Sequence, residues 1–184
     1  MGTHRRLPHW YVEGKALFVT WCLHGAITGP KLPPPGKLSS GQAFVYMDRY
    51  LDTTRTGPMY LRQPKIAEIV VDTVKNGVPL GHYELFAYAV MPNHVHILIG
   101  PKIDPSRLLQ SLKGSTARFA NRALGLSGAS FWQKESYDHW VRNEEEFERI
   151  RHYIEMNPVQ AGLASSPEDY KWSSANHSTS PGVE

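Results

Sequence analysis

The stretch MPNHVHILIG, residues 91–100, decides how the rest of the chain is interpreted. Successive side chains of a strand point to opposite faces of a sheet, so residues two apart share a face. His94 and His96 therefore share one face, and the apolar side chains between and after them form a core-facing surface on the other. Two imidazoles on one face can bind a metal ion, but half-buried histidines without a ligand fit this short spacing equally well.

Apolar patterns on both sides of this strand predict further strands and helices. A first strand is expected at 16–23, where ALFVTWCL is rich in aromatic and β-branched residues. ELFAYAVM, which ends at Met91, is expected to pair antiparallel with the His94 strand. Helices are predicted at 64–77, from Pro105 onward and from Asn143 to Asn157. Gly114 weakens the middle of the second helix, and Pro158 is expected to stop the third.

The segment from Gly25 to Pro64 is expected to be a long loop, because its prolines, clustered at 33–35, prevent regular structure. Within it, AFVYMDRYL is compatible with one short helix, and a loop of this length in a compact domain is often functional. We therefore expect one domain over residues 1–175, with this loop at about 25–64, and a flexible tail at 176–184.

The composition is that of a globular protein in a reducing compartment. The chain has 184 residues, of which 41% are hydrophobic and 20% charged, and no apolar run approaches the roughly 20 residues that span a bilayer. The first residues lack the long apolar core of a secretory signal. The single cysteine, Cys22, cannot form an internal disulfide and lies in an apolar strand. A cytoplasmic location without membrane contact is expected.

The net charge is only +3, but the charge is unevenly distributed along the chain. Residues 105–134 contain no Asp or Glu, whereas the following segment to Glu155 is strongly acidic. A basic helix could contact a phosphate backbone, although an ordinary solvated helix face is slightly favoured on charge alone. The basic residues of this segment are Arg107, Lys113, Arg118, Arg122 and Lys134.

Tyr153 and Asn157 lie four residues apart on the last predicted helix. Four residues of an α-helix turn through roughly 40° more than a full circle and rise about 6 Å, so the two side chains are neighbours. Both flank the apolar stripe and are expected to face the sheet, where a phenol and an amide carbonyl would lie together. For an isolated helix, an interface tyrosine and a C-terminal cap before Pro158 are the simpler interpretation.

Three segments in order carry a family resemblance: MPNHVHILI, FWQKESYDHWVRNEEEFERIRHYIEMNPVQAGL and the closing DYKWSS. They resemble the REP-associated tyrosine transposases, of the single-tyrosine branch of the HUH endonuclease superfamily. The resemblance implies a single α+β domain of the ferredoxin-like (RRM-like) type, with a central antiparallel sheet and packed helices. It implies that Tyr153 is the nucleophile and that His94, His96 and Asn157 bind the metal. The long 25–64 stretch departs from the compact members of the family.

The function that the resemblance implies is that of a transposase, a metal-dependent single-stranded DNA endonuclease and strand transferase. It would act on hairpin-forming repeats through a 5′-phosphotyrosine intermediate, with Mg²⁺ or Mn²⁺ as the metal. It would work as a monomer or homodimer in the cytoplasm, at the nucleoid. The basic residues of 105–134, together with Arg5, Arg6 and His139, are candidate DNA contacts.

Two other functions remain open on the sequence alone. A domesticated protein could hold hairpin DNA without cutting it, although such a protein has no need of a nucleophile. A metal-dependent phosphoesterase could use water and keep Tyr153 as a structural residue. Two imidazoles alone would also favour Zn²⁺ over the Mg²⁺ or Mn²⁺ that the resemblance implies.

Overall fold

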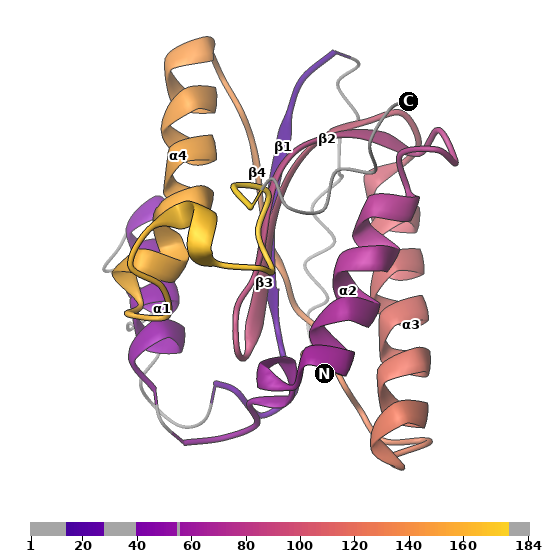
Figure 1. The fold of residues 1–184 in the computed structure, drawn as a ribbon. Coiled ribbons are helices and arrows are strands. Elements are labelled where there is room, and N and C mark those ends of the chain that lie inside the picture. Colours follow the sequence, from indigo (N-terminus) through magenta and orange to yellow (C-terminus); the bar gives the residue numbers. More distant parts are fainter. Residues whose placement is uncertain (1–13, 28–39, 55, 177–184) are drawn as a thin grey trace, which may run out of the picture.

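Four antiparallel strands form the central sheet of the computed structural model, which describes residues 14–27, 40–54 and 56–176 (Figure 1). The strands are β1 (Leu17–Cys22), β2 (Tyr83–Val90), β3 (His94–Pro101) and β4 (Tyr137–Trp140). They lie in the order β2-β3-β1-β4, so the two central strands are β1 and the histidine-bearing β3. This order, and a β-α-β-β-α-β succession to which two further α-helices are added, define a ferredoxin-like α+β fold, which confirms the predicted fold class.

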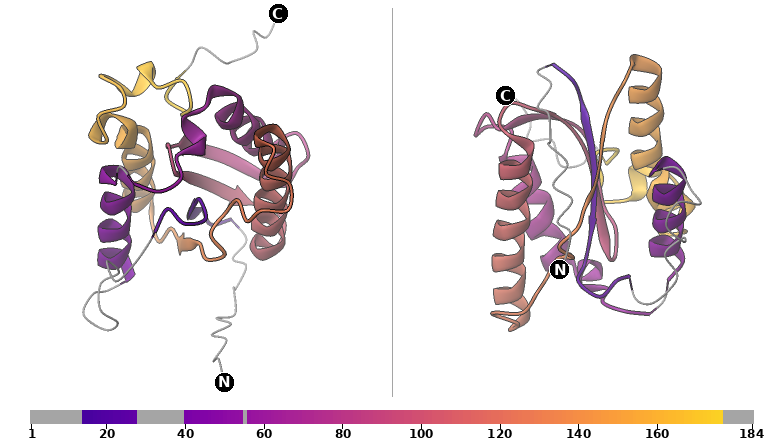
Figure 2. Two further views of the ribbon diagram at one scale, coloured as in Figure 1. Left: turned by 90° about the horizontal axis from the view of Figure 1, so that it is seen from below. Right: turned by 180° about the vertical axis from the view of Figure 1, so that it is seen from behind.

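Four α-helices of the described residues cover the two faces of the sheet. They are α1 (Ser40–Thr53), α2 (Pro64–Asn76), α3 (Pro105–Leu124) and α4 (Glu144–Gln160), with short 3₁₀ helices at Tyr60–Arg62 and Pro167–Asp169. Figure 2 shows α2 and α3 on one face and α1 and α4 on the other. Within the described ranges, none of these helices is both long enough and apolar enough to cross a membrane.

Strand β3 separates the apolar core from the histidine face. Val95, Ile97 and Ile99 are fully buried in a cluster that includes Val70 and Val74 of α2. The two histidines occupy the opposite face, toward α1 and α4, as the alternation predicts. Removing one such aliphatic side chain from water contributes roughly 1.5–3 kcal/mol, so this apolar layer holds the strand in its register.

Three helices differ in extent from the sequence-based expectation. Helix α1 spans 14 residues within the segment expected to be a loop with one short helix. Helix α3 runs unbroken through Gly114, because packing against α2 outweighs a propensity cost of about 1 kcal/mol. Helix α4 continues to Gln160, since Pro158 lies in its last turn and removes only one backbone donor there. The prolines at 33–35 and the chain after Asn176 lie outside the described residues.

Gly77 follows α2 for a steric reason rather than a conformational one. Its φ of −65° is open to any residue, but an added Cβ would overlap the ring of the buried Tyr83. The Tyr83 hydroxyl donates to the Val74 carbonyl, which keeps the ring in place. Gly77→Ala is therefore expected to lower the free energy of unfolding by about 1–3 kcal/mol, measured by urea denaturation. Gly114→Ala, whose Cβ meets no atom within 4 Å, is the control, and equal urea midpoints would contradict the argument.

The thiol of Cys22 is expected to be inert in the native protein. The residue is 5% exposed, and burial raises the pKa of its thiol to about 11. Because the thiolate is the reactive form, thiol reagents at about pH 8 should modify the protein quickly only in denaturant. The check is the rate of thiol labelling with and without urea. Rapid labelling of the native chain would show that β1 opens to solvent.

Candidate metal and nucleophile site

His94 and His96 turn their rings toward one point on the face of the sheet that α1 and α4 cover. Both side chains are fully buried, and their Nε2 atoms lie 3.0 Å apart. The other ring nitrogens are engaged by neighbours: His96 Nδ1 lies 2.7 Å from Thr20 Oγ1 on β1, and His94 Nδ1 lies 2.7 Å from Asn93 Oδ1. These contacts fix both rings and leave both Nε2 atoms directed into the site.

The hydrogen bonds of His94 determine which of its nitrogens carries the proton. Asn93 Nδ2 donates to the Leu51 carbonyl, which can only accept, so the amide oxygen of Asn93 faces the histidine. His94 Nδ1 must then carry the proton, and Nε2 keeps its lone pair. Burial, assisted by the neighbouring His96, lowers the pKa of His94 to about 3, so this ring is neutral near pH 7. A neutral imidazole held in this way is the form that binds a metal ion.

Helix α1 adds a carboxylate to the two histidines. Asp48 is 2% exposed, and its Oδ1 lies 3.5 Å from His94 Nε2 and 3.2 Å from His96 Nε2. Burial by itself raises the pKa of Asp48, but the charges and hydrogen bonds of His96, His94 and Asn157 outweigh burial and lower it. One ligand atom from each of the three residues lies within 4.8 Å of the others, a spacing that one metal ion can bridge.

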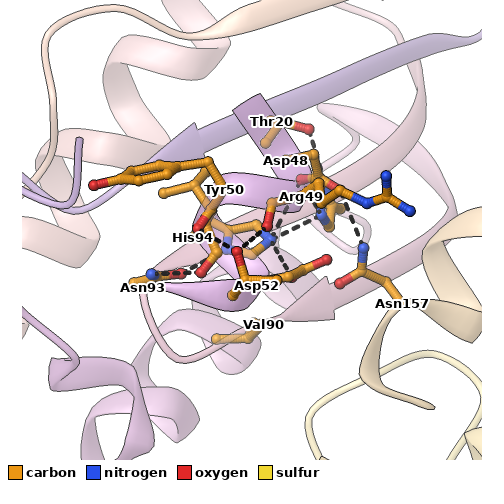
Figure 3. A network of polar contacts seen from close by, with 12 residues as sticks. Thr20, Asp48, Arg49, Tyr50, Asp52, Val90, Asn93, His94 and Asn157 are labelled. Atoms are coloured by element: carbon orange, nitrogen blue, oxygen red, sulfur yellow. Dashed lines mark hydrogen bonds and ion pairs between the residues drawn. The ribbon is translucent and has the colours of Figure 1, made fainter. Parts of the chain in front are cut away.

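Helix α4 brings Asn157 and Tyr153 to the same place, as their spacing predicts. Asn157 is fully buried, and its Nδ2 donates to Asp48 Oδ2 at 3.2 Å and to the Tyr153 hydroxyl oxygen at 3.4 Å. The Tyr153 ring is half-buried and lies edge-on to His96 and Phe18, with centroids 5.9 and 6.4 Å away. The candidate nucleophile and the candidate ligands therefore lie side by side, contributed by β3, α1 and α4. Figure 3 shows His94, Asp48 and Asn157 of this group.

The chemistry of this group fits a divalent cation. Asn157 Oδ1 is buried and accepts no hydrogen bond from the described residues, and Asp48 Oδ1 has the two histidine Nε2 atoms near it but no hydrogen bond of good geometry. A buried oxygen atom without a partner is costly, and a bound cation would satisfy both atoms. With the two Nε2 atoms they form a donor set of two nitrogens and two oxygens, which borderline divalent ions accept. The buried Asp/His/His group thus supports the expectation of a divalent metal site.

A second carboxyl group of α1 lies at the edge of the site. Asp52 follows Asp48 by one helical turn, and its Oδ1 lies 3.7 Å from His94 Nε2 (Figure 3). Burial and then the charge of Asp48 raise the pKa of Asp52 to about 7. The sequence reasoning missed both carboxyl groups. The signal was present in YMDRYLD, because acidic residues at i and i+4 share one face of a helix.

The basic residues of 105–134 lie on or after α3, on the sheet face opposite to the histidines (Figure 2). Lys113 does not extend to solvent, because its Nζ donates to the carbonyls of Gln133 and Lys134 at 2.8 and 3.0 Å. It ties α3 to the segment that leads to β4, and a DNA contact of Lys113, as of the other basic residues of this set, stays a prediction. The exposed members of the set are Arg107, Arg118, Arg122 and Lys134. DNA contacts from this face would be remote from the histidine site.

The structure does not bring His139 into contact with the metal group. Its Nε2 lies 3.1 Å from Glu146 Oε1, in the first turn of α4 and about two turns before Tyr153. The N-terminal candidates Arg5 and Arg6 lie outside the described residues. A role of these three residues in DNA binding stays a prediction.

A strand with two histidines that faces a tyrosine-bearing helix on a ferredoxin-like sheet is the arrangement of a single-tyrosine transposase. The family model described as "Transposase IS200 like" matches residues 61–157, which is more than half of the chain. The chain therefore belongs to the IS200-like transposase family. The matched span includes both histidines, Tyr153 and Asn157, whereas Asp48 precedes it.

Individual relatives agree with this assignment. A candidate REP-associated tyrosine transposase of Haemophilus influenzae is 22% identical over 103 residues, which are 50% of this chain, and the chain spans 58% of the relative's length. A solved REP-associated tyrosine transposase bound to a REP hairpin matches with a TM-score of 0.57 and 22% identity, covering 94% of this chain and 82% of that one. This likeness confirms the fold. A candidate transposase of Deinococcus radiodurans, with 21% identity and coverages of 85% and 98%, has a TM-score of only 0.39.

Proposed function

We propose that this protein is a metal-dependent single-stranded DNA endonuclease and strand transferase, a transposase that acts on hairpin-forming repeats. The observation that carries the proposal is the convergence of two imidazoles, a carboxylate and an amide beside the Tyr153 hydroxyl. A phosphoesterase that uses water needs no tyrosine at this place. A protein that only holds hairpins needs neither the tyrosine nor the ligand set.

The residues that would hold the metal, proposed to be Mg²⁺ or Mn²⁺, are His94, His96, Asn157 and Asp48. When bound, such an ion neutralises a non-bridging phosphate oxygen and makes the phosphorus more electrophilic. The two oxygen donors favour these hard ions more than the imidazoles alone do. Thr20 and Asn93 hold the two rings in orientation, so the ligand atoms are positioned before any ion arrives.

Tyr153 would attack the phosphorus of a phosphodiester. The bond between its hydroxyl oxygen and phosphorus forms as the P–O3′ bond breaks, which leaves a 5′-phosphotyrosine and a free 3′-hydroxyl. Asn157 donates to that hydroxyl oxygen, so it orients the nucleophile and stabilises the phenolate that develops during attack. Because the link conserves the energy of the phosphodiester, a 3′-hydroxyl can later rejoin the strand without ATP. Such positioning supplies most of the catalysis in phosphoryl transfer.

Repeated palindromes that fold into hairpins are the proposed substrate, since the structural relative is bound to a REP hairpin. The exposed arginines of α3 would contact phosphates away from the cleavage point, because they lie on the other face of the sheet. We propose that the protein acts as a monomer or homodimer in the cytoplasm, where the nucleoid supplies its substrate.

A covalent-adduct assay tests the proposed function. Labelled single strands that carry a repeat hairpin with its flanking nucleotides are incubated with the protein and Mn²⁺ or Mg²⁺, then separated on a denaturing gel. The expected result is a labelled band at the mass of the protein plus the cleaved strand. Binding without cleavage would support a hairpin-holding protein, and cleavage without an adduct would support a phosphoesterase that uses water.

A further inference from the structure

A hollow of about 510 Å³ adjoins the metal site beyond Asp52, and we refer to it as the Asp52 hollow. It lies between the end of α1, the 3₁₀ helix at Tyr60–Arg62, the turn between β2 and β3, and the chain that follows α4. Its volume is within the range of sites that bind small molecules or single residues of a polymer. The lining residues used below are Asp52, Met59, Arg62, Met91, Ala161 and Leu163.

The Asp52 hollow adjoins the candidate metal site through one shared side chain. Asp52 lines the hollow, and its Oδ1 lies 3.7 Å from the ligand atom Nε2 of His94. Two other wall residues hold the histidine strand: the Leu51 carbonyl accepts from Asn93, and the Met91 backbone N–H donates to the His94 carbonyl at 2.9 Å. A substrate group bound at the metal ligands would therefore have its next covalent neighbour at the mouth of this hollow.

The wall of the hollow has two kinds of surface. Met59 and Leu163, both partly exposed, provide apolar and polarisable contacts of the kind that pack against a flat ring. Asp52, whose side chain is 14% exposed, provides a polar carboxyl group, and the exposed Arg62 adds a positive charge. A nucleoside has complementary parts, because its base has apolar faces and a hydrogen-bonding edge and its neighbour is an anionic phosphate.

The other two hollows fit the role less well. One lies at the far end of β3 and is lined by Lys15, Phe86 and Phe147, with no residue of the metal group. The other lies between α2 and α3, on the opposite face of the sheet. Unlike these two hollows, the Asp52 hollow shares a side chain with the histidine site.

We propose that the Asp52 hollow receives the nucleoside that adjoins the scissile phosphodiester of a single-stranded DNA substrate. The base lies between Met59 and Leu163, its polar edge meets the Asp52 carboxyl group, and Arg62 contacts the next phosphate. This inference rests on the proposed function, since a phosphodiester at the metal ligands has a nucleoside on each side. The hollow thus makes the site select among bases as well as cleave.

The test measures DNA binding in a Tyr153→Phe background, where no strand is cut. Fluorescein-labelled hairpin strands, each lacking the base of one flanking nucleotide, are titrated with the protein and Mn²⁺ by anisotropy. Adduct mapping with the unsubstituted chain identifies the cut. The missing base next to the cut is expected to weaken binding on the order of tenfold.

A second substitution tells whether the hollow causes that loss. Ala161→Trp places an indole in the hollow, so the intact strand should bind on the order of tenfold more weakly and removal of the base should have no further effect. Gln160→Trp at the exposed end of α4 is the matched control and should retain the full effect of the missing base.

Arg62→Ala leaves the hollow open and should lower the slope of log affinity against log salt concentration by about one.

The outcomes distinguish failure of the nucleoside inference from failure of the proposed function. If Ala161→Trp binds the intact strand as tightly as its parent, the hollow takes no nucleoside and the inference is wrong, even where the active chain forms its adduct. If the coupling is found for one flanking base but no adduct forms, the proposed function fails, and the hollow holds a nucleoside of the strand that does not adjoin a cut. If Ala161→Trp does not fold, an unchanged salt slope in Arg62→Ala overturns the inference.

Discussion

Replacing Tyr153 with phenylalanine is expected to abolish the covalent protein–DNA adduct and leave the fold and hairpin binding intact. The change removes one oxygen atom and keeps the ring, whose centroid lies 6.4 Å from that of Phe18 and 6.1 Å from that of Phe44. Since a phenyl ring cannot attack phosphorus, strand cleavage should fall by at least about a thousandfold, as it does when an enzyme loses its nucleophile. A denaturing gel measures the adduct, and anisotropy measures hairpin binding.

Tyr137→Phe is the matched control for this substitution. Tyr137 belongs to the same aromatic cluster, stacked on Phe44 with centroids 4.4 Å apart, so loss of its hydroxyl perturbs the same surroundings. It is expected to keep its adduct. An adduct that survives Tyr153→Phe and disappears in Tyr137→Phe would move the nucleophile to β4. Cleavage that survives both substitutions would indicate attack by water.

The histidine and tyrosine parts of the site could be predicted because each depends on local periodicity. The two-residue repeat of β3 determines that His94 and His96 share a face, and burial of Val95 on the other face fixes which way the strand lies. The four-residue spacing of Tyr153 and Asn157 makes them neighbours on any α-helix. Only the meeting of the two pairs required tertiary structure, and the family resemblance supplied it.

The spacing of Asp48 and Asp52 shows that they share one face of a helix, but that this face meets the histidines depends on how α1 packs. The helix follows a segment rich in proline, and nothing in its own sequence says which face of the sheet it covers. Its apolar residues contact both the sheet and the tyrosine helix, for example through Phe44 against Phe18. A carboxylate on such a helix is an ordinary surface residue until the packing is known.

The basic segment, residues 105–134, is a clear feature of the sequence that does not by itself locate a binding site. Its lack of acidic residues is a property of the linear sequence, and it says nothing about which side of the sheet the helix covers. The structure places α3 away from the histidines and uses Lys113 to hold backbone carbonyls. A run of like charges is therefore weaker evidence for a local binding site than two residues whose spacing matches the geometry of their element.

His94→Ala is expected to eliminate metal binding and cleavage while much of the hairpin binding remains. The substitution removes one nitrogen ligand and leaves the Asp48 carboxylate, 3.5 Å from the lost Nε2, with one fewer partner. Changes in residues that only support the ligands cost roughly 10–100-fold in metal affinity, so loss of a direct ligand should cost more than about a hundredfold. Calorimetric titration with Mn²⁺ measures the affinity, and anisotropy measures hairpin binding.

Thermal unfolding supplies a second measurement that does not depend on catalysis. An ion that binds only the folded state stabilises it by about 2.7 kcal/mol at a hundred times its dissociation constant, so Mn²⁺ should raise the melting temperature of the parent and not that of His94→Ala. His152→Ala is the matched control, because His152 adjoins Tyr153 in sequence but is exposed on α4, and it should keep the full response. If Mn²⁺ stabilises His94→Ala as much as the parent, the metal binds elsewhere. The absence of a well-formed hydrogen bond at the buried atoms Asp48 Oδ1 and Asn157 Oδ1 would then require another explanation.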